Sequence, residues 1–319
     1  MRSEHRRIPI SDVEERFVRV VTPGEPAGGR TLVIVHGVGE HSGRYEHFIR
    51  TAVSRGWTVI AGDLRGHGNS TGVPTHLDCF SQYLDDLNTI WEHFELDARP
   101  TALFGHSMGG LVATRFAQTF PDRVAAVVLS SPLLAFGVRV PPLKRTFGRV
   151  CLYVAPHKRF QSTIPLEHIT SNESALQLRI NDPLANRSVT AGWYFRVMDA
   201  LYSAWQEADR LTAPLLLLQG EADQVVRAEA PLDWYPNVGS ADKSLHLLPG
   251  LLHELLNEPG WKGTIDRILG WLEHRIPSES RCSRSAVAGR DHSLATIHAE
   301  SLSGSRQALG DVAKGRQSA

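Results

Sequence analysis

The residues best suited to chemistry are a serine and the glycines beside it, in the pentapeptide Gly-His-Ser-Met-Gly at residues 105–109. An apolar run, residues 101–104, precedes it, and a helical apolar segment follows. Glycines on both sides of a serine allow a strand-to-helix turn sharp enough to expose the hydroxyl group. The pattern therefore predicts that Ser107 is a nucleophile at the N-terminus of a helix.

A serine hydroxyl needs a neighbouring base, and the chain offers a base and an acid in a suitable order. Asp223 follows the apolar run 214–218, and His253 follows the apolar run 243–248. In sheets with a serine elbow, the acid and then the histidine follow the serine along the chain. We predict that His253 accepts the Ser107 proton, while Asp223 orients the imidazole and stabilises its charged form.

An acyl-transfer site also needs donors for the developing oxyanion. The Met108 backbone N–H is one candidate, because the helix dipole favours negative charge there. The loop at residues 36–41 follows another apolar run and contains two glycines that let the backbone approach a substrate. Val38 N–H is the predicted second donor, and an ordinary strand-to-helix turn is the alternative interpretation of this loop.

These loops require a sheet that brings them to one edge. Six short runs are largely apolar and do not alternate with polar residues, which is typical of parallel strands buried on both faces. Helical periodicity lies between them, most clearly over residues 80–94. The alternation predicts an α/β fold with a mostly parallel, doubly wound sheet. The runs are residues 31–35, 58–61, 101–104, 126–129, 214–218 and 243–248.

Residues 133–210 interrupt the alternation, because they contain aromatic residues and a helical stretch at 190–208 but no buried-strand run. We expect them to form a helical cap inserted into a core of residues 1–132 and 211–276. The alternative is an additional core helix. Residues 277–319 are rich in Ser, Arg, Gly and Ala, and they are predicted to form a disordered tail.

Composition excludes several function classes. The 34 basic and 34 acidic residues give a formal net charge of zero, which argues against a nucleic-acid partner. The three cysteines are scattered, and no metal-binding or nucleotide-binding motif occurs, so neither metal nor cofactor is expected. No signal peptide or long apolar run is visible, so a cytoplasmic location is expected. Oligomeric state is not predicted.

Five ordered motifs resemble the monoacylglycerol lipase and lysophospholipase branch of the α/β-hydrolase fold, the serine aminopeptidase S33 or Hydrolase-4 type. They are HGVGEHSGRY at 36–45, DLRGHGNS at 63–70, GHSMGG at 105–110, QGEAD at 219–223 and HELLNE at 253–258. The resemblance spans roughly residues 13–276. It implies a Ser107, Asp223 and His253 triad, with Val38 and Met108 as oxyanion donors and no cofactor.

The same resemblance implies a carboxylic ester hydrolase that acts on monoacylglycerol-like or lysophospholipid-like substrates. Glu40, Arg44 and His106 occupy positions that lie near the glycerol end of the pocket in lipases of this group. Leu256 stands where the mammalian enzymes have a histidine. The family's mobile apolar cap also implies transient contact with a membrane or micelle surface.

Three alternatives remain open from the sequence. An aminopeptidase of this fold usually has His-Gly-Gly-Pro-Gly where this chain has His-Gly-Val-Gly-Glu at residues 36–40. A general short-chain carboxylesterase would use the same triad. A catalytically silent receptor or scaffold typically lacks a triad member, and here all three residue types are present.

Overall fold

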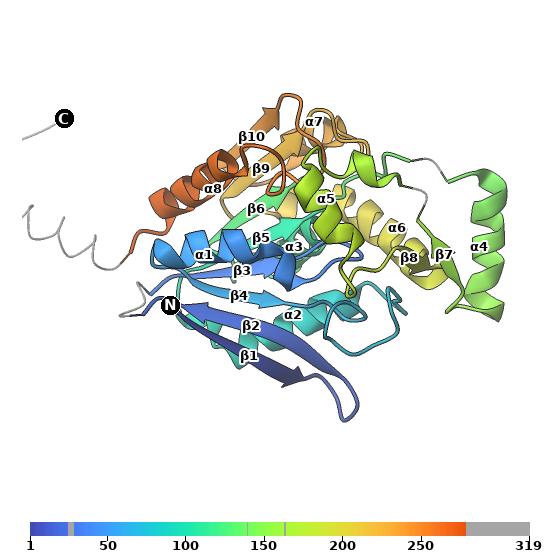
Figure 1. Ribbon diagram of the computed structural model, residues 1–319, viewed down its shortest axis with the longest axis horizontal. Helices are drawn as coiled ribbons and strands as arrows, with labels where there is room; N and C mark the ends of the chain where they lie inside the picture. Colours follow the sequence, from blue (N-terminus) through green and yellow to red (C-terminus); the bar gives the residue numbers. More distant parts are fainter. Residues whose placement is uncertain (25–28, 139, 163, 279–319) are drawn as a thin grey trace, which may run out of the picture. The chain divides into compact units, whose positions relative to one another are not determined.

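The apolar runs form neighbouring strands of one eight-stranded sheet in the computed structural model, which describes residues 1–24, 29–138, 140–162 and 164–278. The strand order is β1-β2-β4-β3-β5-β6-β9-β10, and every pair from β4 to β10 is parallel. Figure 1 shows these strands side by side, from β1 and β2 at the bottom of the view to β9 and β10 near the top. The strands are β1 (Arg2–Pro9), β2 (Glu15–Thr22), β3 (Thr31–Val35), β4 (Thr58–Gly62), β5 (Thr101–His106), β6 (Ala126–Ser130), β9 (Leu215–Gly220) and β10 (Lys243–Leu248).

The first two strands were not predicted from the sequence. They form an antiparallel hairpin, and β2 pairs antiparallel with β4 at one edge of the sheet. β1 is exposed at most positions, so it lacks the continuous apolar run of a buried strand. The predicted tail at residues 277–319 lies outside the described residues, apart from Pro277 and Ser278.

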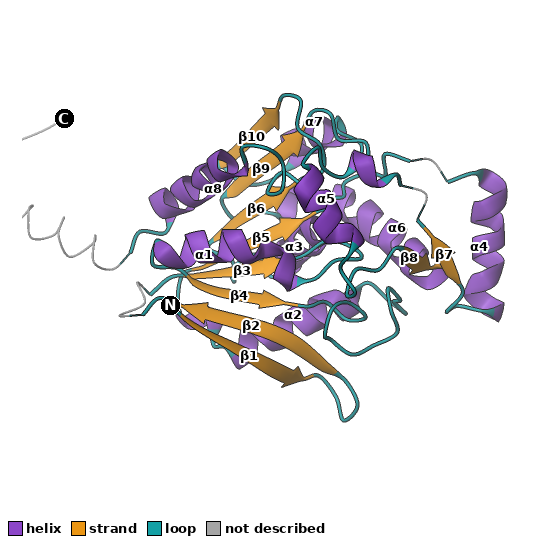
Figure 2. Ribbon diagram, in the orientation of Figure 1, coloured by secondary structure: helices purple, strands orange, loops and turns teal. Residues whose placement is uncertain are grey.

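Helices cover both faces of the sheet, because alternate strand residues point to opposite sides. Leu32 and Ile34 pack with α1 (Glu46–Ser54) and α8 (Trp261–Arg275) on one face. Val33 and Val35 pack on the other face with α2, α3 and α6. Figure 2 shows this arrangement of helices around the strands. The second set of helices is α2 (Ser81–His93), α3 (Met108–Thr119) and α6 (Ala191–Gln206).

The segment between β6 and β9 carries several elements outside the main sheet. They are α4 (Pro142–Val154), the short antiparallel strands β7 (Arg159–Gln161) and β8 (Ser188–Thr190), α5 (Glu173–Ile180) and α6. Figure 1 shows α4 and β7 standing away from the main sheet. The apolar face of α6 belongs to the same core cluster as α3, so this helix also covers the sheet.

Backbone hydrogen bonds hold this insertion at its beginning and again just before α6. Leu133 N–H donates to the Ser107 carbonyl at 2.9 Å, and Thr190 N–H donates to the Thr75 carbonyl at 3.1 Å. The insertion therefore leaves the sheet beside the serine elbow and returns against the loop that follows β4. Among the helices of the described ranges, none has the length and apolarity needed to cross a membrane.

Candidate active site

The serine elbow lies between β5, which ends at His106, and α3, which begins at Met108. Ser107 has φ 55° and ψ −120°, a conformation that non-glycine residues rarely adopt. A Cβ atom on Gly109 would lie 2.2 Å from the Val35 carbonyl oxygen, so only glycine fits beside β3. The strained turn directs the hydroxyl group out of the backbone toward a histidine.

Two hydrogen bonds in series, called the relay below, join the three residues predicted as a triad. The distance between Ser107 Oγ and His253 Nε2 is 2.9 Å, and that between His253 Nδ1 and Asp223 Oδ2 is 2.8 Å. All three residues are buried. Because a carboxylate can only accept, Nδ1 carries the proton, and Nε2 is free to accept the serine proton.

Asp223 is held by both of its oxygens. Oδ1 accepts the backbone N–H groups of Val225 and Val226 at 2.8 and 3.1 Å. Oδ2 accepts Gln219 Nε2 at 3.0 Å in addition to His253. Burial alone would raise the pKa of Asp223, but the His253 charge and these hydrogen bonds hold the pKa below its usual value. The carboxylate therefore stays ionised beside His253.

Gln219 was not identified as a site residue from the sequence, although it opens the QGEAD motif. It is fully buried at the end of β9. Its amide donates to the same Asp223 oxygen that accepts the hydrogen bond from His253 Nδ1–H. No signal in the sequence indicates this contact, because the turn after β9 brings the two side chains together.

The two predicted oxyanion donors lie on either side of Ser107. Met108 N–H is at the start of α3, where the first backbone N–H groups have no acceptor within the helix. Val38 lines the pocket together with Ser107. Neither N–H group has a hydrogen-bond acceptor among the described residues. The N–H of Gly37, by contrast, donates to the Glu40 side chain.

Glu40 is enclosed rather than exposed to the pocket centre. Its Oε1 accepts the Gly37 N–H and the Tyr45 hydroxyl, the latter at 2.7 Å, and its Oε2 lies 3.3 Å from Arg44 Nε. Burial favours a higher pKa for Glu40, but His106 in its protonated form and the guanidinium groups of Arg44 and Arg179 lower this pKa overall. Arg44 packs behind Glu40 and does not line the pocket.

Two further charged residues complete this cluster, and neither was identified from the sequence. Glu254 follows the triad histidine and pairs with Arg44 at 2.7 Å and with Arg179 at 2.9 Å. Arg179 comes from α5 in the insertion and lies 3.9 Å from Glu40. Burial raises the pKa of Glu254, but Arg179 and Arg44 together lower it below its usual range. Two carboxylates and two guanidinium groups therefore balance one another beside the site.

His106 lies against the triad without joining it. Its Nδ1 donates to the Ser130 carbonyl at 3.0 Å, and its ring centroid is 4.8 Å from that of His253. Burial and the charge of His253 lower the pKa of His106 to about 4. This imidazole is therefore neutral at physiological pH and presents its Nε2 as an acceptor.

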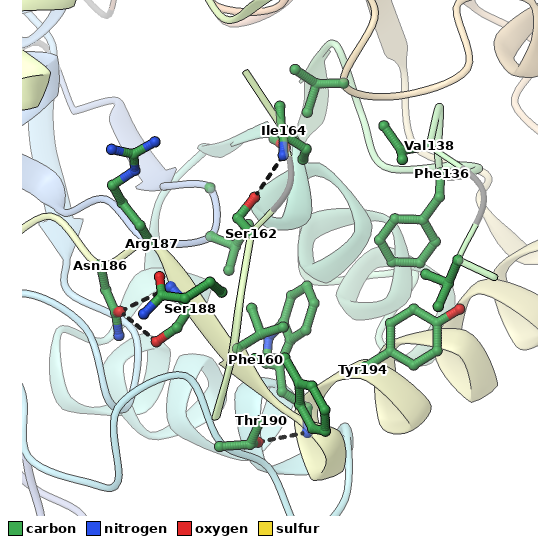
Figure 3. A pocket seen from close by; sticks show the side chains of 18 of the residues that line it. Phe136, Val138, Phe160, Ser162, Ile164, Asn186, Arg187, Ser188, Thr190 and Tyr194 are labelled. Carbon is green, nitrogen blue, oxygen red and sulfur yellow. Dashed lines mark hydrogen bonds between the residues drawn. The ribbon is translucent and has the colours of Figure 1, made fainter. Parts of the chain in front are cut away.

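A cavity of about 230 Å³ opens above Ser107 and His253. Most of its lining comes from the insertion, and Figure 3 shows apolar side chains alongside the polar group of Asn186, Arg187 and Ser188. Phe136 and Tyr194 lie side by side, with ring centroids 5.6 Å apart. Other apolar lining residues are Val138, Phe160, Ile164, Leu166, Val189 and Trp193.

No group of three His, Cys, Asp or Glu side chains within the described ranges is arranged to hold a metal ion. A buried serine–imidazole–carboxylate relay at the carboxyl edge of a parallel sheet, beneath an inserted segment, defines the class: this is an α/β-hydrolase.

The profile of the serine aminopeptidase S33 family (Hydrolase_4) matches residues 28–260, and the chain belongs to this family. Phospholipase YtpA of Bacillus subtilis is 32% identical over 230 residues, covering 72% of this chain and 89% of that protein. The monoacylglycerol lipase of Mycolicibacterium smegmatis is 30% identical over 279 residues, covering 85% and 97%. The crystal structure of Paleococcus ferrophilus monoacylglycerol lipase superimposes with a TM-score of 0.74 at 31% identity, covering 81% and 99%.

The expected family, the α/β-hydrolase fold and the assignment as a hydrolase are therefore confirmed. The matched region includes every residue of the relay and both loops that carry the candidate oxyanion donors.

Proposed function

We propose that this protein is a serine hydrolase that cleaves carboxylic esters of single-chain lipids, of the monoacylglycerol or lysophospholipid kind, through an acyl-enzyme. The observation that carries the proposal is the Ser107–His253–Asp223 relay at the base of an apolar cavity. The names of the relatives, a phospholipase and monoacylglycerol lipases, support a lipid ester as the substrate.

In the proposed first step, Ser107 Oγ attacks the ester carbonyl carbon while His253 Nε2 takes the hydroxyl proton. The carbonyl oxygen becomes an oxyanion, which the N–H groups of Val38 and Met108 stabilise. Asp223 stabilises the imidazolium. The C–O bond to the alcohol then breaks, and His253 returns the proton to the leaving oxygen.

The second step reverses these roles with water as the nucleophile. His253 takes a water proton as the water oxygen attacks the acyl carbon, and the proton then returns to Ser107 as the fatty acid leaves. His106 stays neutral beside the imidazolium, because its pKa is lowered to about 4. Only one of the two adjacent imidazoles therefore carries charge during the cycle.

We further propose that residues 133–210 act as the substrate cap over a core of residues 1–132 and 211–276. The aromatic and aliphatic side chains that line the cavity come mainly from this insertion. They would enclose the acyl chain, since apolar area removed from water contributes about 25 cal/mol per Å². His106 and the outer edges of Glu40 and Arg179 would face the alcohol, while Arg44 would act through Glu40.

The outer face of α4 supports contact with a lipid surface. Leu143, Phe147, Val150 and Val154 recur at helical spacing and are all more than half exposed. Lys144, Arg145 and Arg149 lie on the same helix. An exposed apolar stripe with basic neighbours is typical of helices that lie in a membrane interface. We propose a transient contact through α4 that places the cavity near its substrate.

The charge pattern of the site favours an ester over a peptide substrate. An aminopeptidase binds a protonated α-amino group, which calls for a carboxylate without a cationic partner. Both carboxylates that line the cavity, Glu40 and Glu254, are paired with arginines. The remaining lining is largely apolar, as a fatty acyl chain requires.

The test uses the purified full chain with p-nitrophenyl esters from acetate to palmitate, a monoacylglycerol, a lysophosphatidylcholine and an amino-acyl anilide. We expect the wild-type protein to hydrolyse esters and Ser107→Ala to be inactive. A fluorophosphonate probe should label only the wild-type protein. Full activity in Ser107→Ala, or anilide turnover above ester turnover, would overturn the proposal. The ratio between the two lipid substrates identifies the headgroup.

A further inference from the structure

The loop that carries Val38 is held from outside the core. We name residues 36–41 the oxyanion loop and residues 179–186, at the end of α5 and the following turn, the clamp segment. The N–H of Asn186 donates to the Gly39 carbonyl at 2.9 Å. Gly39 has φ +71°, and a Cβ atom on it would lie 2.0 Å from the Asn186 carbonyl oxygen. The two backbones are therefore in close contact, directly beside Val38.

A side-chain contact fixes the same two segments. His41 Nε2 lies 2.9 Å from Asp182 Oδ2, and both side chains are only 14% exposed. His41 Nδ1 accepts the Gly43 N–H at 3.2 Å, so the neutral ring carries its proton on Nε2 and donates to Asp182. The other oxygen of Asp182 accepts the Leu184 N–H at 2.9 Å, which holds the carboxylate in its turn.

The third contact passes through the buried charge cluster. Arg179 pairs with Glu254, the neighbour of His253, and lies 3.9 Å from Glu40. Glu40 in turn accepts the N–H of Gly37. The residues on both sides of Val38 are thus fixed, Gly37 by Glu40 and Gly39 by Asn186.

We propose that the clamp segment positions the oxyanion hole and that Asp182 is its positioning residue, an inference that rests on the hydrolase activity proposed above. Asp182 touches neither substrate nor the reacting atoms. It holds His41, and through the loop it fixes the direction of the Val38 N–H. An oxyanion donor acts only when its hydrogen points at the position that the charged oxygen takes in the transition state. The inserted segment therefore contributes to the chemical step as well as to substrate binding.

The variant Asp182→Asn separates this role from folding. The asparagine carbonyl can still accept the Leu184 N–H, because Asn is well suited to such turns. Its amide NH₂ group then faces the Nε2–H of His41, so two donors oppose each other. His41 cannot relieve this by moving its proton to Nδ1 without opposing the Gly43 N–H. The contact is lost while the side-chain shape is kept.

The matched control is Glu173→Ala at the start of α5, the helix that precedes Asp182. It also removes one carboxylate, but among the described residues Glu173 bonds only to Gln177. A second variant, His41→Asn, breaks the contact from the other side while its side chain can still cap Gly43. Melting temperatures establish that each protein is folded.

The experiment measures kcat and KM for p-nitrophenyl butyrate, and Ki for an alkyl trifluoromethyl ketone that forms an oxyanion adduct with the serine. Asp182→Asn should lower kcat about three- to thirty-fold with KM nearly unchanged, since loss of a whole oxyanion donor costs roughly 100-fold or more. Ki should rise by the same factor. Asp182→Asn should add nothing in the His41→Asn background, as expected for coupled residues.

A kcat of Asp182→Asn within twofold of the wild type would overturn the inference. Three other results would also overturn the inference. The reductions in kcat could add in the double variant, Glu173→Ala could lower kcat by the same factor, or Asp182→Asn could change KM alone. These outcomes are distinct from failure of the proposed function, which would show as a wild-type protein without serine-dependent turnover.

Discussion

Replacing Asp223 by asparagine changes the hydrogen-bonding capacity of one atom at the base of the relay. The structure determines how the new side chain must lie. Two backbone N–H groups, those of Val225 and Val226, point at Oδ1. The asparagine carbonyl must take this position, because the reversed orientation would set an NH₂ group against both donors.

The size of this preference can be worked out. A buried donor left without an acceptor costs about 1–3 kcal/mol. The reversed orientation opposes two backbone donors and the other orientation opposes only the Gln219 amide, so the net preference is one such donor, about 1–3 kcal/mol. The amide NH₂ therefore faces His253. The imidazole then accepts on Nδ1 and carries its proton on Nε2, which points at Ser107. In this tautomer His253 cannot accept the serine proton.

We expect Asp223→Asn to lower kcat about 10³- to 10⁴-fold, the range seen when a triad histidine is held in the wrong tautomer. This corresponds to roughly 4–5.5 kcal/mol in the activation barrier. KM for p-nitrophenyl butyrate and the melting temperature should change little, because the cavity and the two backbone contacts remain. The assay is steady-state ester hydrolysis, together with the rate of fluorophosphonate labelling. A kcat within tenfold of the wild type would refute the assignment of Asp223 as the residue that orients His253.

Three further predictions follow from the same contacts. Gly109→Ala should lower the free energy of unfolding by about 3 kcal/mol or more, because its Cβ would lie 2.2 Å from the Val35 carbonyl oxygen. Urea denaturation measures this change. The control is Gly263→Ala, because a Cβ atom at residue 263 would have no heavy atom within 4 Å. Gln219→Leu should lower kcat about tenfold at unchanged melting temperature. A hydrogen bond to a charged acceptor contributes about 1.5–3 kcal/mol, and part of this stabilises the ion pair in the transition state. An unchanged kcat would show that Gln219 has no role in catalysis. Burial and the His36 charge lower the pKa of His67 to about 3. The unfolded chain, with a pKa of about 6.5, therefore takes up a proton that the folded chain does not, and stability should fall by about 2 kcal/mol between pH 6.5 and 5. The dependence should be shallower in His67→Asn; equal slopes would contradict the assignment.

The sequence predicted the parts of the fold that depend on continuous burial. The six runs correspond to β3, β4, β5, β6, β9 and β10. The first five are buried almost throughout, whereas β10 is a half-buried edge strand that includes Lys243, Ser244 and His246. The hairpin of β1 and β2 escaped prediction, since an exposed edge strand leaves little apolar signal. Burial therefore decides what can be predicted.

In the candidate site, too, some residues could be predicted from the sequence and others could not. Ser107, Asp223 and His253 could be found because each follows a predicted strand, and parallel strands end at one edge. Arg179 could not be found, because it approaches the site from an insertion whose path the sheet does not determine. Gln219 and Glu254 lie within recognised motifs, but only three-dimensional contacts reveal what they bind.

The hydrogen bonds of the insertion bear on how this enzyme could diversify. Residues 134–178 contact the loops of the acid and the histidine: Ala135 and Gly137 bond to the backbone beside Asp223, and Ile169 and Ser171 bond to Glu254 and Glu258. Residues 179–190 contact the oxyanion loop and the loop after β4. A chimaera that exchanges the whole insertion with that of a relative would therefore have to exchange the matching residues of the oxyanion loop as well. Selectivity can evolve in cavity-lining side chains that make no such bonds, such as Phe160 and Tyr194, while the residues bonded to the catalytic loops are constrained to coevolve with them.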